Sequence, residues 1–361
     1  MSLLNKVIKE ITPVSKEAAQ KAQKHLDNLI KPIGSLGRLE EIGVRLAAIT
    51  GQVVPDLPKK CVVVFAADNG ICEEGVSSAP ADITAAQLLN MTKGLTGINV
   101  LSKQAGSDVY LVDIGVNADL PYDKIINKKI RRGTRNMLKE AAMTRQEAIQ
   151  ALETGIAMAL DLVAQGYQVI GTGEMGIGNT SSSAAVIMGL TGYPAEEVTG
   201  KGAGMTEKDY QRKKEIIKAV IAKHQPDKQD PLDVLSKVGG YDIAAMAGVF
   251  LGCAYKRVPV VIDGVISITA ALVAARLNPL AVDYMLPSHL SAEPGYSVVL
   301  KELGLKAYLL LDMRLGEGSG CPLAFFLIDC ALAIGREMGT FEQGNIDGSV
   351  LVDIREDQSK S

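Results

Sequence analysis

Apolar runs alternate with helix-patterned segments along most of the chain. The first run, CVVVFAADNGI at residues 61–71, is rich in β-branched residues and unbroken over its first half, which is typical of a strand buried on both faces of a parallel sheet. Five further runs predict strands, at residues 108–113, 167–171, 258–262, 281–286 and 307–311. Because helical segments separate these strands, the sequence predicts an α/β fold with a doubly wound, mostly parallel sheet.

The residues before the first strand predict helices only. Ser15 is placed to cap a helix that runs to about Ile30. Pro32 and Gly34 interrupt that helix, and a second one is expected over residues 38–49.

This pattern suggests a division of the chain into domains. We expect residues 1–58 to be a helical segment that contributes to a small domain, together with the C-terminal part of the chain. Residues 59–340 are then the large α/β catalytic domain. Residues 341–361 form a polar tail, which we expect to be frayed from Arg355 on.

Composition narrows the class of protein. The chain has 361 residues, 47% of them hydrophobic, and a formal net charge of −3, so no basic surface points to nucleic acid as a partner. With three histidines and no CxxC pair among five cysteines, we expect no metal site, no cofactor and a reducing compartment. The N-terminus lacks a secretory apolar core, and no apolar stretch forms a clean membrane span. We therefore expect a cytoplasmic protein that does not bind membranes.

A glycine-rich segment, GTGEMGIGNTSSSAA, follows the strand predicted at 167–171. Its Gly171-x-Gly173-x-x-Gly176 spacing matches the dinucleotide fingerprint. We disfavour an NAD-dependent oxidoreductase, because the match lies in mid-chain and a lone match is weak. The glycines, with Asn179 and Thr180 at a helix start, instead predict a phosphate cradle.

The stretch LLLDMRLGEGSGCPLAFFLIDCALAI at residues 309–334 predicts a strand, a glycine turn and a long apolar helix. Glu317 lies in the turn between Gly316 and Gly318. Small neighbours let a ligand approach its carboxylate, which makes Glu317 a candidate general base. From this segment alone, a helix-capping role for Glu317 has about equal weight.

Other predicted loops suit a phosphorylated sugar. Gly202 lies in a second glycine loop, Lys213 on the polar helix that follows, Asp263 after a buried strand, and Ser291 in the segment PSHLSAEPG. The carboxylates of Glu174 and Glu317 would then serve a reaction at the sugar C1′, where the transition state is cation-like.

Each of these residues also has a structural interpretation. Lys213 fits a solvated lysine about as well as a phosphate ligand, and Asp263 fits a helix cap. For His289 we favour a core histidine that bonds a turn backbone. The basic segment KIINKKIRRGTR at residues 124–135 fits a solvated loop better than a device that steers anions.

The chain resembles the nicotinate-nucleotide:dimethylbenzimidazole phosphoribosyltransferase family of the cobalamin pathway. The resemblance spans nearly the whole chain and rests on the segments KPIGSLGRLE, AADNGICEEGV, GEMGIGNTSSSAA, LSKVGGYDIAAMAG, IDG, PSHLSAEPG and RLGEGSG. It implies a Rossmann-like large domain with a small helical domain, usually dimeric. It also implies transfer of ribose 5-phosphate from nicotinate mononucleotide to a lower-ligand base, with inversion at C1′.

The resemblance also assigns roles to residues. The family's general base matches Glu317, and its second active-site glutamate matches Glu174. The expected contacts to phosphate, ribose and the aromatic base are Gln87, Gly176, Asn179, Thr180, Gly202, Lys213, Asp263, Ser291, Leu315 and Gly316.

The sequence departs from the family pattern at two positions. Asn69 stands where the family commonly has a histidine, and Ala79 where it has a serine eight residues before Gln87. These departures leave two alternatives to a homodimeric enzyme that uses dimethylbenzimidazole or a related base. One is a phenol- or p-cresol-activating relative that works with a paralogous second subunit, and the other is a non-catalytic nucleotide-binding partner. The retained Glu317 argues against the latter.

Overall fold

The computed structural model describes residues 2–202, 204–348 and 351–355. In these residues a parallel sheet has the strand order β3-β2-β1-β4-β5-β6. The strands are β1 (Lys60–Ala67), β2 (Asp108–Gly115), β3 (Ile126–Asn127), β4 (Val169–Met175), β5 (Val260–Ile262) and β6 (Met285–Pro287). Every residue of β1 is buried, as its unbroken apolar sequence predicts for a central strand.

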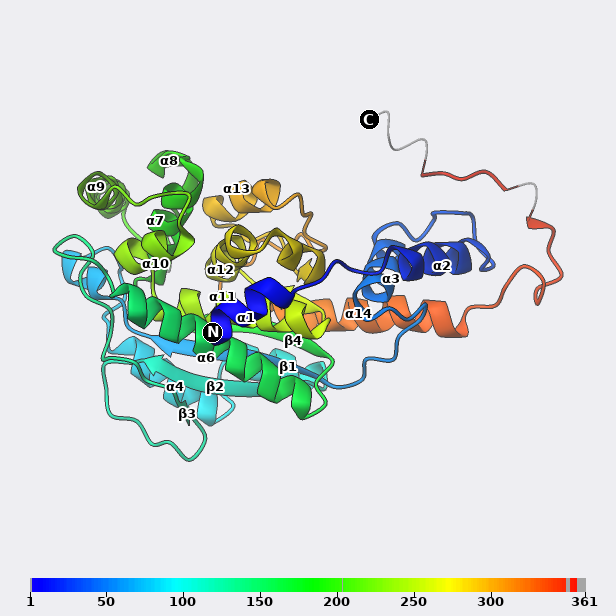
Figure 1. Ribbon diagram of the computed structural model, residues 1–361, viewed down its shortest axis with the longest axis horizontal. Helices are drawn as coiled ribbons and strands as arrows, with labels where there is room; N and C mark the ends of the chain where they lie inside the picture. Colours follow the sequence, from blue (N-terminus) through cyan, green and yellow to red (C-terminus); the bar gives the residue numbers. More distant parts are fainter. Residues whose placement is uncertain (1, 203, 349–350, 356–361) are drawn as a thin grey trace.

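Helices cover both faces of this sheet (Figure 1). On one face lie α4 (Ile83–Thr92), α5 (Gly97–Gln104) and α14 (Gly320–Glu337). On the other lie α6 (Arg145–Ala164), α11 (Tyr241–Lys256) and α12 (Val265–Leu277), with α1 (Leu3–Glu10) packed on α6 and α11. The predicted doubly wound α/β fold is confirmed.

The remaining helices lie at the two ends of the molecule. At one end are α7 (Asn179–Thr191), α8 (Ala195–Val198), α9 (Glu207–His224) and α10 (Pro231–Val238), and α13 (Pro294–Glu302) packs on α12 and α8 beside them. At the other end are α2 (Lys16–Asp27) and α3 (Arg38–Thr50). Two short 3₁₀ helices are η1 (Gly70–Glu74) and η2 (Pro279–Tyr284).

Local side-chain hydrogen bonds mark the starts of α2 and α6. The Ser15 side chain accepts a hydrogen bond from the N–H of Ala18 at the start of α2. Thr144 and Glu147 form a reciprocal capping box at the start of α6. These bonds are local in sequence, which is why the chain alone predicts them.

The predicted strand over residues 307–311 is wrong. Leu309 forms only an isolated bridge with His289, and Leu310 is 76% exposed, so this apolar run lies at the surface rather than in the sheet. The sixth strand is instead β3, a two-residue edge strand beside β2. It was missed because two residues carry no alternating pattern.

The N-terminal helices contact the C-terminal segment. Helix α3 packs on α2 and α14. The N–H of Ile30 donates to the carbonyl of Gly339, and the Arg355 guanidinium pairs with Asp27. The proposed domain boundaries after residues 58 and 340 stay a prediction. The frayed tail expected from Arg355 on falls on residues 356–361, which lie outside the described residues.

Candidate active site

A cavity of about 360 Å³ opens at the carboxyl ends of β4, β5 and β6, where open α/β sheets bind their ligands. Ten of the twelve predicted site residues line it: Gln87, Glu174, Gly176, Asn179, Thr180, Gly202, Ser291, Leu315, Gly316 and Glu317. The other two, Lys213 and Asp263, are buried; Lys213 bonds Thr180 of the cavity wall, and Asp263 bonds Gly318, the residue after Glu317. The structure therefore brings residues that are far apart in the sequence to one place.

The turn that carries Glu317 has an unusual backbone. Gly316, Glu317 and Gly318 have φ values of 85°, 63° and 87°. For a residue with a side chain, this left-handed conformation costs about 1 kcal/mol or more and persists only when the surroundings impose it. Asp263 does so, because its two carboxylate oxygens accept the N–H groups of Gly318 (3.0 Å) and Gly320 (2.7 Å).

Asp263 therefore holds the turn rather than lining the cavity. This differs from the ribose contact that we expected. It also differs from a cap of the helix after β5, because the Gly320 N–H that Asp263 accepts belongs to the start of α14. Burial raises the pKa of the Asp263 carboxyl to about 7, against the lowering effect of the two N–H donors.

The glycines of the predicted fingerprint serve close packing. Gly171 and Gly173 lie within β4 rather than in a loop. A Cβ on Gly173 would lie 2.5 Å from the carbonyl oxygen of Glu317, and one on Gly171 would lie 2.6 Å from the Cβ of Cys321. The fingerprint is thus the part of β4 that the Glu317 turn crosses, which gives a structural reason to reject the dinucleotide interpretation.

The Glu317 carboxylate is buried and held by two donors. Gln87 Nε2 on α4 donates to Oε1 (2.8 Å), and the backbone N–H of Ile98, in the first turn of α5, donates to Oε2 (3.0 Å). These bonds fix the direction of the carboxylate, and each oxygen keeps a lone pair that can accept a further proton.

Glu174, the second carboxylate, ends β4 beside this turn. Its Oε2 accepts a hydrogen bond from Asn179 Nδ2, and its Oε1 lies against the backbone of Gly316. Burial and, to a lesser extent, the nearby carboxylate of Asp242 raise the Glu174 pKa to about 8. Asn179, expected as a substrate contact, directs its amide nitrogen to these two carboxyl groups.

Lys213 contacts the predicted phosphate cradle through Thr180. Its ammonium is 1% exposed and donates to Thr180 Oγ1 (2.8 Å) and to the carbonyl of Gly200 (3.1 Å). Desolvation lowers its pKa to about 8. The structure thus excludes the solvated lysine, and it places a buried cation behind the glycine loop that contains Gly202.

Three titratable residues that line the cavity were not assigned to the site from the sequence: Glu293, Arg314 and His289. Glu293 accepts the N–H of Gly202 (3.1 Å). His289 Nδ1 lies 3.0 Å from Ser288 Oγ, and burial lowers the His289 pKa to about 4, so the ring is neutral. Glu293 and Arg314 belong to the segments PSHLSAEPG and RLGEGSG, so their positions in these segments were the available signal.

The two departures from the family pattern, Asn69 and Ala79, both line a second cavity, and Ala79 lines the first cavity as well. Ser77 also lines both cavities. Asn69 is buried and accepts a hydrogen bond from Ser182 Oγ (2.9 Å). It lines only the second cavity.

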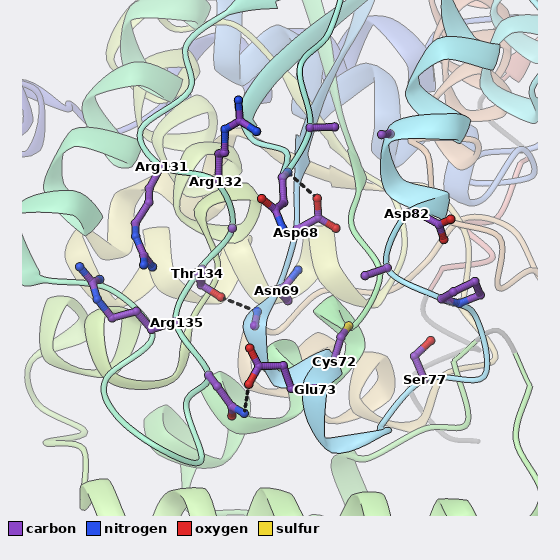
Figure 2. Close-up of a pocket in the computed structure, with 18 of the residues that line it drawn as sticks. Asp68, Asn69, Cys72, Glu73, Ser77, Asp82, Arg131, Arg132, Thr134 and Arg135 are labelled. Atoms are coloured by element: carbon purple, nitrogen blue, oxygen red, sulfur yellow. Dashed lines mark hydrogen bonds between the residues drawn. The ribbon is translucent and has the colours of Figure 1, made fainter.

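The second cavity, of about 930 Å³, lies beyond β1 and β2 (Figure 2). Figure 2 shows Arg131, Arg132 and Arg135 on one side of it and Ser77 and Asp82 on the other. The cations are largely neutralised by carboxylates in three ion pairs: Arg132–Asp119, Arg135–Glu147 and Lys139–Glu73. Three of the six cations in the basic segment, Lys129, Arg132 and Arg135, therefore form ion pairs with carboxylates of the folded chain.

Among the described residues, no group of three or more His, Cys, Asp and Glu side chains is arranged to hold a metal ion. In the same part of the chain, no helix has the length and apolar character needed to cross a membrane.

Known proteins resemble this chain over nearly its full length. A family model described as Phosphoribosyltransferase matches residues 11–346. A protein of Clostridium acetobutylicum is 52% identical over 95% of this chain and 98% of its own length. One of Clostridium perfringens (strain ATCC 13124) is 49% identical over 99% of both chains. Both are called nicotinate-nucleotide–dimethylbenzimidazole phosphoribosyltransferase.

A solved structure shares the fold. The crystal structure of CobT from Thermus thermophilus superposes with a TM-score of 0.89 at 38% sequence identity. It covers 92% of this chain and 100% of that one.

Proposed function

The chain belongs to the nicotinate-nucleotide–dimethylbenzimidazole phosphoribosyltransferase family, and we propose that its 360 Å³ cavity carries out that transfer. Ribose 5-phosphate moves from nicotinate mononucleotide to 5,6-dimethylbenzimidazole or a related base, giving the α-ribotide and nicotinate. The observation that carries the assignment is the Glu317 carboxylate, oriented by Gln87 and Ile98 in the same cavity as Glu174. The relatives' names do not favour the phenol-activating or non-catalytic alternatives.

Glu317 acts as the general base in this mechanism. One ring nitrogen of the benzimidazole attacks C1′ while Glu317 accepts the proton from the other. The attack breaks the bond between C1′ and the nicotinate nitrogen and inverts C1′ from β to α. Nicotinate leaves with a neutral ring nitrogen, so its departure needs no acid.

Glu174 and the phosphate cradle would each interact with a charged part of the substrate. Glu174 lies where an anion would stabilise the oxocarbenium-like charge at C1′. Gly176, Thr180 and Gly202 would hold the phosphate by N–H and hydroxyl groups, with the charge of Lys213 behind them. Ser291 and Leu315 line the rest of the cavity and would contact ribose and base.

Product analysis tests this function. Wild-type protein incubated with nicotinate mononucleotide and dimethylbenzimidazole should give α-ribotide without added metal, with the anomers resolved by chromatography. Nucleotide binding without any ribotide formation would contradict the proposal.

Replacing Lys213 by Met should raise KM for nicotinate mononucleotide about 10- to 100-fold, since a hydrogen bond to a charged group contributes about 1.5–3 kcal/mol. The kcat value should change much less, because the phosphate is bound before and during reaction. Lys208→Met, on the exposed side of the same helix, is the control and should keep the wild-type KM. An unchanged KM in Lys213→Met would remove the lysine from the phosphate site.

We also propose a homodimer, with a heterodimer as the alternative. Apolar side chains of α5, of α14, which packs on α5, and of the Glu317 turn are exposed, among them Val100, Phe326 and Leu315, with Phe326 66% exposed. Apolar surface of this kind is typical of a protein interface. Sedimentation analysis should find a dimer, and a concentration-independent monomer would contradict this.

A cytoplasmic location is proposed as well. All five cysteines are unpaired, which suits a reducing compartment.

A further inference from the structure

One side-chain amide bridges two buried carboxyl groups beneath the cavity. Asn179 Nδ2 lies 2.5 Å from Glu174 Oε2 and 2.9 Å from Asp242 Oδ2. Asp242, at the start of α11, is fully buried and also accepts the N–H of Ile243 (2.9 Å). It does not line the cavity, and the mechanism above gives it no role.

The charges around this pair are negative. Glu174 faces Asp242 on α11, Asp263 after β5 and the turn of Glu317, while Asp242 also faces Asp68 after β1. Among the described residues, neither Glu174 nor Asp242 forms an ion pair with a lysine or arginine. Burial raises the Asp242 pKa to about 6, and the Glu174 pKa is higher still. Two full charges on one shared amide are therefore unfavourable, and such a pair titrates as a unit.

The substrate supplies the missing positive charge. In a nicotinate nucleotide the ring nitrogen bonded to C1′ is a pyridinium cation, and C1′ itself becomes cation-like as that bond breaks. A cation that enters the cavity beside Glu174 favours the ionised form of the pair.

We propose that Asp242 is a positioning residue that acts on Glu174 through the amide of Asn179, and that the pair holds one proton until the nucleotide binds with its pyridinium nitrogen beside Glu174. The protonated pair and the nucleotide then give the bound nucleotide, the ionised pair and one proton released to water. This inference rests on the proposed function, because it takes nicotinate mononucleotide as the ligand.

The pH dependence of kcat/KM tests the coupling. Asp242→Asn keeps an oxygen that can accept from Asn179 but removes the charge. Since a neighbouring anion raises the pKa of an acid, its removal should lower the Glu174 pKa. The acidic limb of kcat/KM should then move to lower pH by about one unit. Asp113→Asn, which replaces a buried carboxyl on β2 that pairs with Lys129, is the control and should leave the limb in place.

Calorimetry measures the proton released on nucleotide binding without requiring turnover. Nicotinate mononucleotide is titrated into wild-type enzyme at pH 7 in two buffers of different ionisation enthalpy. Ribose 5-phosphate, which has the phosphate but no pyridinium, is the matched ligand. Wild type should release about one proton more with the nucleotide than with ribose 5-phosphate. In Asp242→Asn this difference should fall to less than half.

Equal proton release for the two ligands in wild type would overturn the inference, even if Asp242→Asn fails to fold. An unmoved acidic limb in a folded Asp242→Asn enzyme would overturn it as well. Failure of the nucleotide to bind wild type would instead overturn the proposed function, and this inference with it.

Discussion

Glu317→Gln should lower kcat about 10²–10⁴-fold, the range for loss of a general base. The substitution keeps the length of the side chain but leaves no group able to take the benzimidazole proton. It also turns an amide toward Gln87 and Ile98, which donate to Glu317 in the native site. Because the phosphate cradle is untouched, KM for nicotinate mononucleotide should change little. Steady-state kinetics with product anomers resolved measures both constants.

The control for this substitution is Glu140→Gln, at an exposed glutamate of the second cavity. It should keep wild-type kinetics. A Glu317→Gln enzyme with more than about a tenth of wild-type kcat would assign Glu317 a smaller role than that of a general base.

Gly316→Ala should lower kcat about 10²-fold, because displacements of about 1 Å at a reacting centre cost that much. The new Cβ would lie 2.5 Å from Glu174 Oε1. Asn179 holds the other oxygen of that carboxyl group, so either Glu174 or the Glu317 turn must move. Alanine at a φ of 85° should also cost about 1–2 kcal/mol of stability. Kinetics and urea unfolding measure the two effects.

Gly304→Ala is the control that separates the backbone strain of an alanine at positive φ from the steric clash with Glu174. Gly304 has a φ of 64°, and a Cβ there would meet nothing within 4 Å. This variant should lose a similar stability but keep its activity. If both variants retain wild-type kcat, the contact between Gly316 and Glu174 does not matter for catalysis.

Much of the site could be predicted from short segments. The segment RLGEGSG identified Glu317, and the glycine-rich segment before α7 identified Glu174, Gly176 and Thr180, all of which line one cavity. These residues come together because parallel strands share one carboxyl edge, and their roles in the reaction stay predictions.

Other interpretations failed where the partner was remote in sequence. Gly171 and Gly173 look like a dinucleotide loop until the Glu317 turn is seen to cross them. Lys213 looked equally like a solvated lysine until Thr180 and Gly200 enclosed it. Asp242 was not among the predicted site residues, because the residue that it contacts, Asn179, lies 63 positions away in the chain.

By itself, the sequence determined the alternation of strands and helices, the helix caps at Ser15 and Thr144, and the glycine turn around Glu317. Each of these depends on residues within a few positions of one another, where propensity and hydrogen bonding act directly. Only the tertiary structure decided that Asp263 holds the turn and that Asn179 joins Glu174 to Asp242. Burial and the approach of distant carboxylates set the protonation of these groups, and both arise only when the sheet brings its strand ends together.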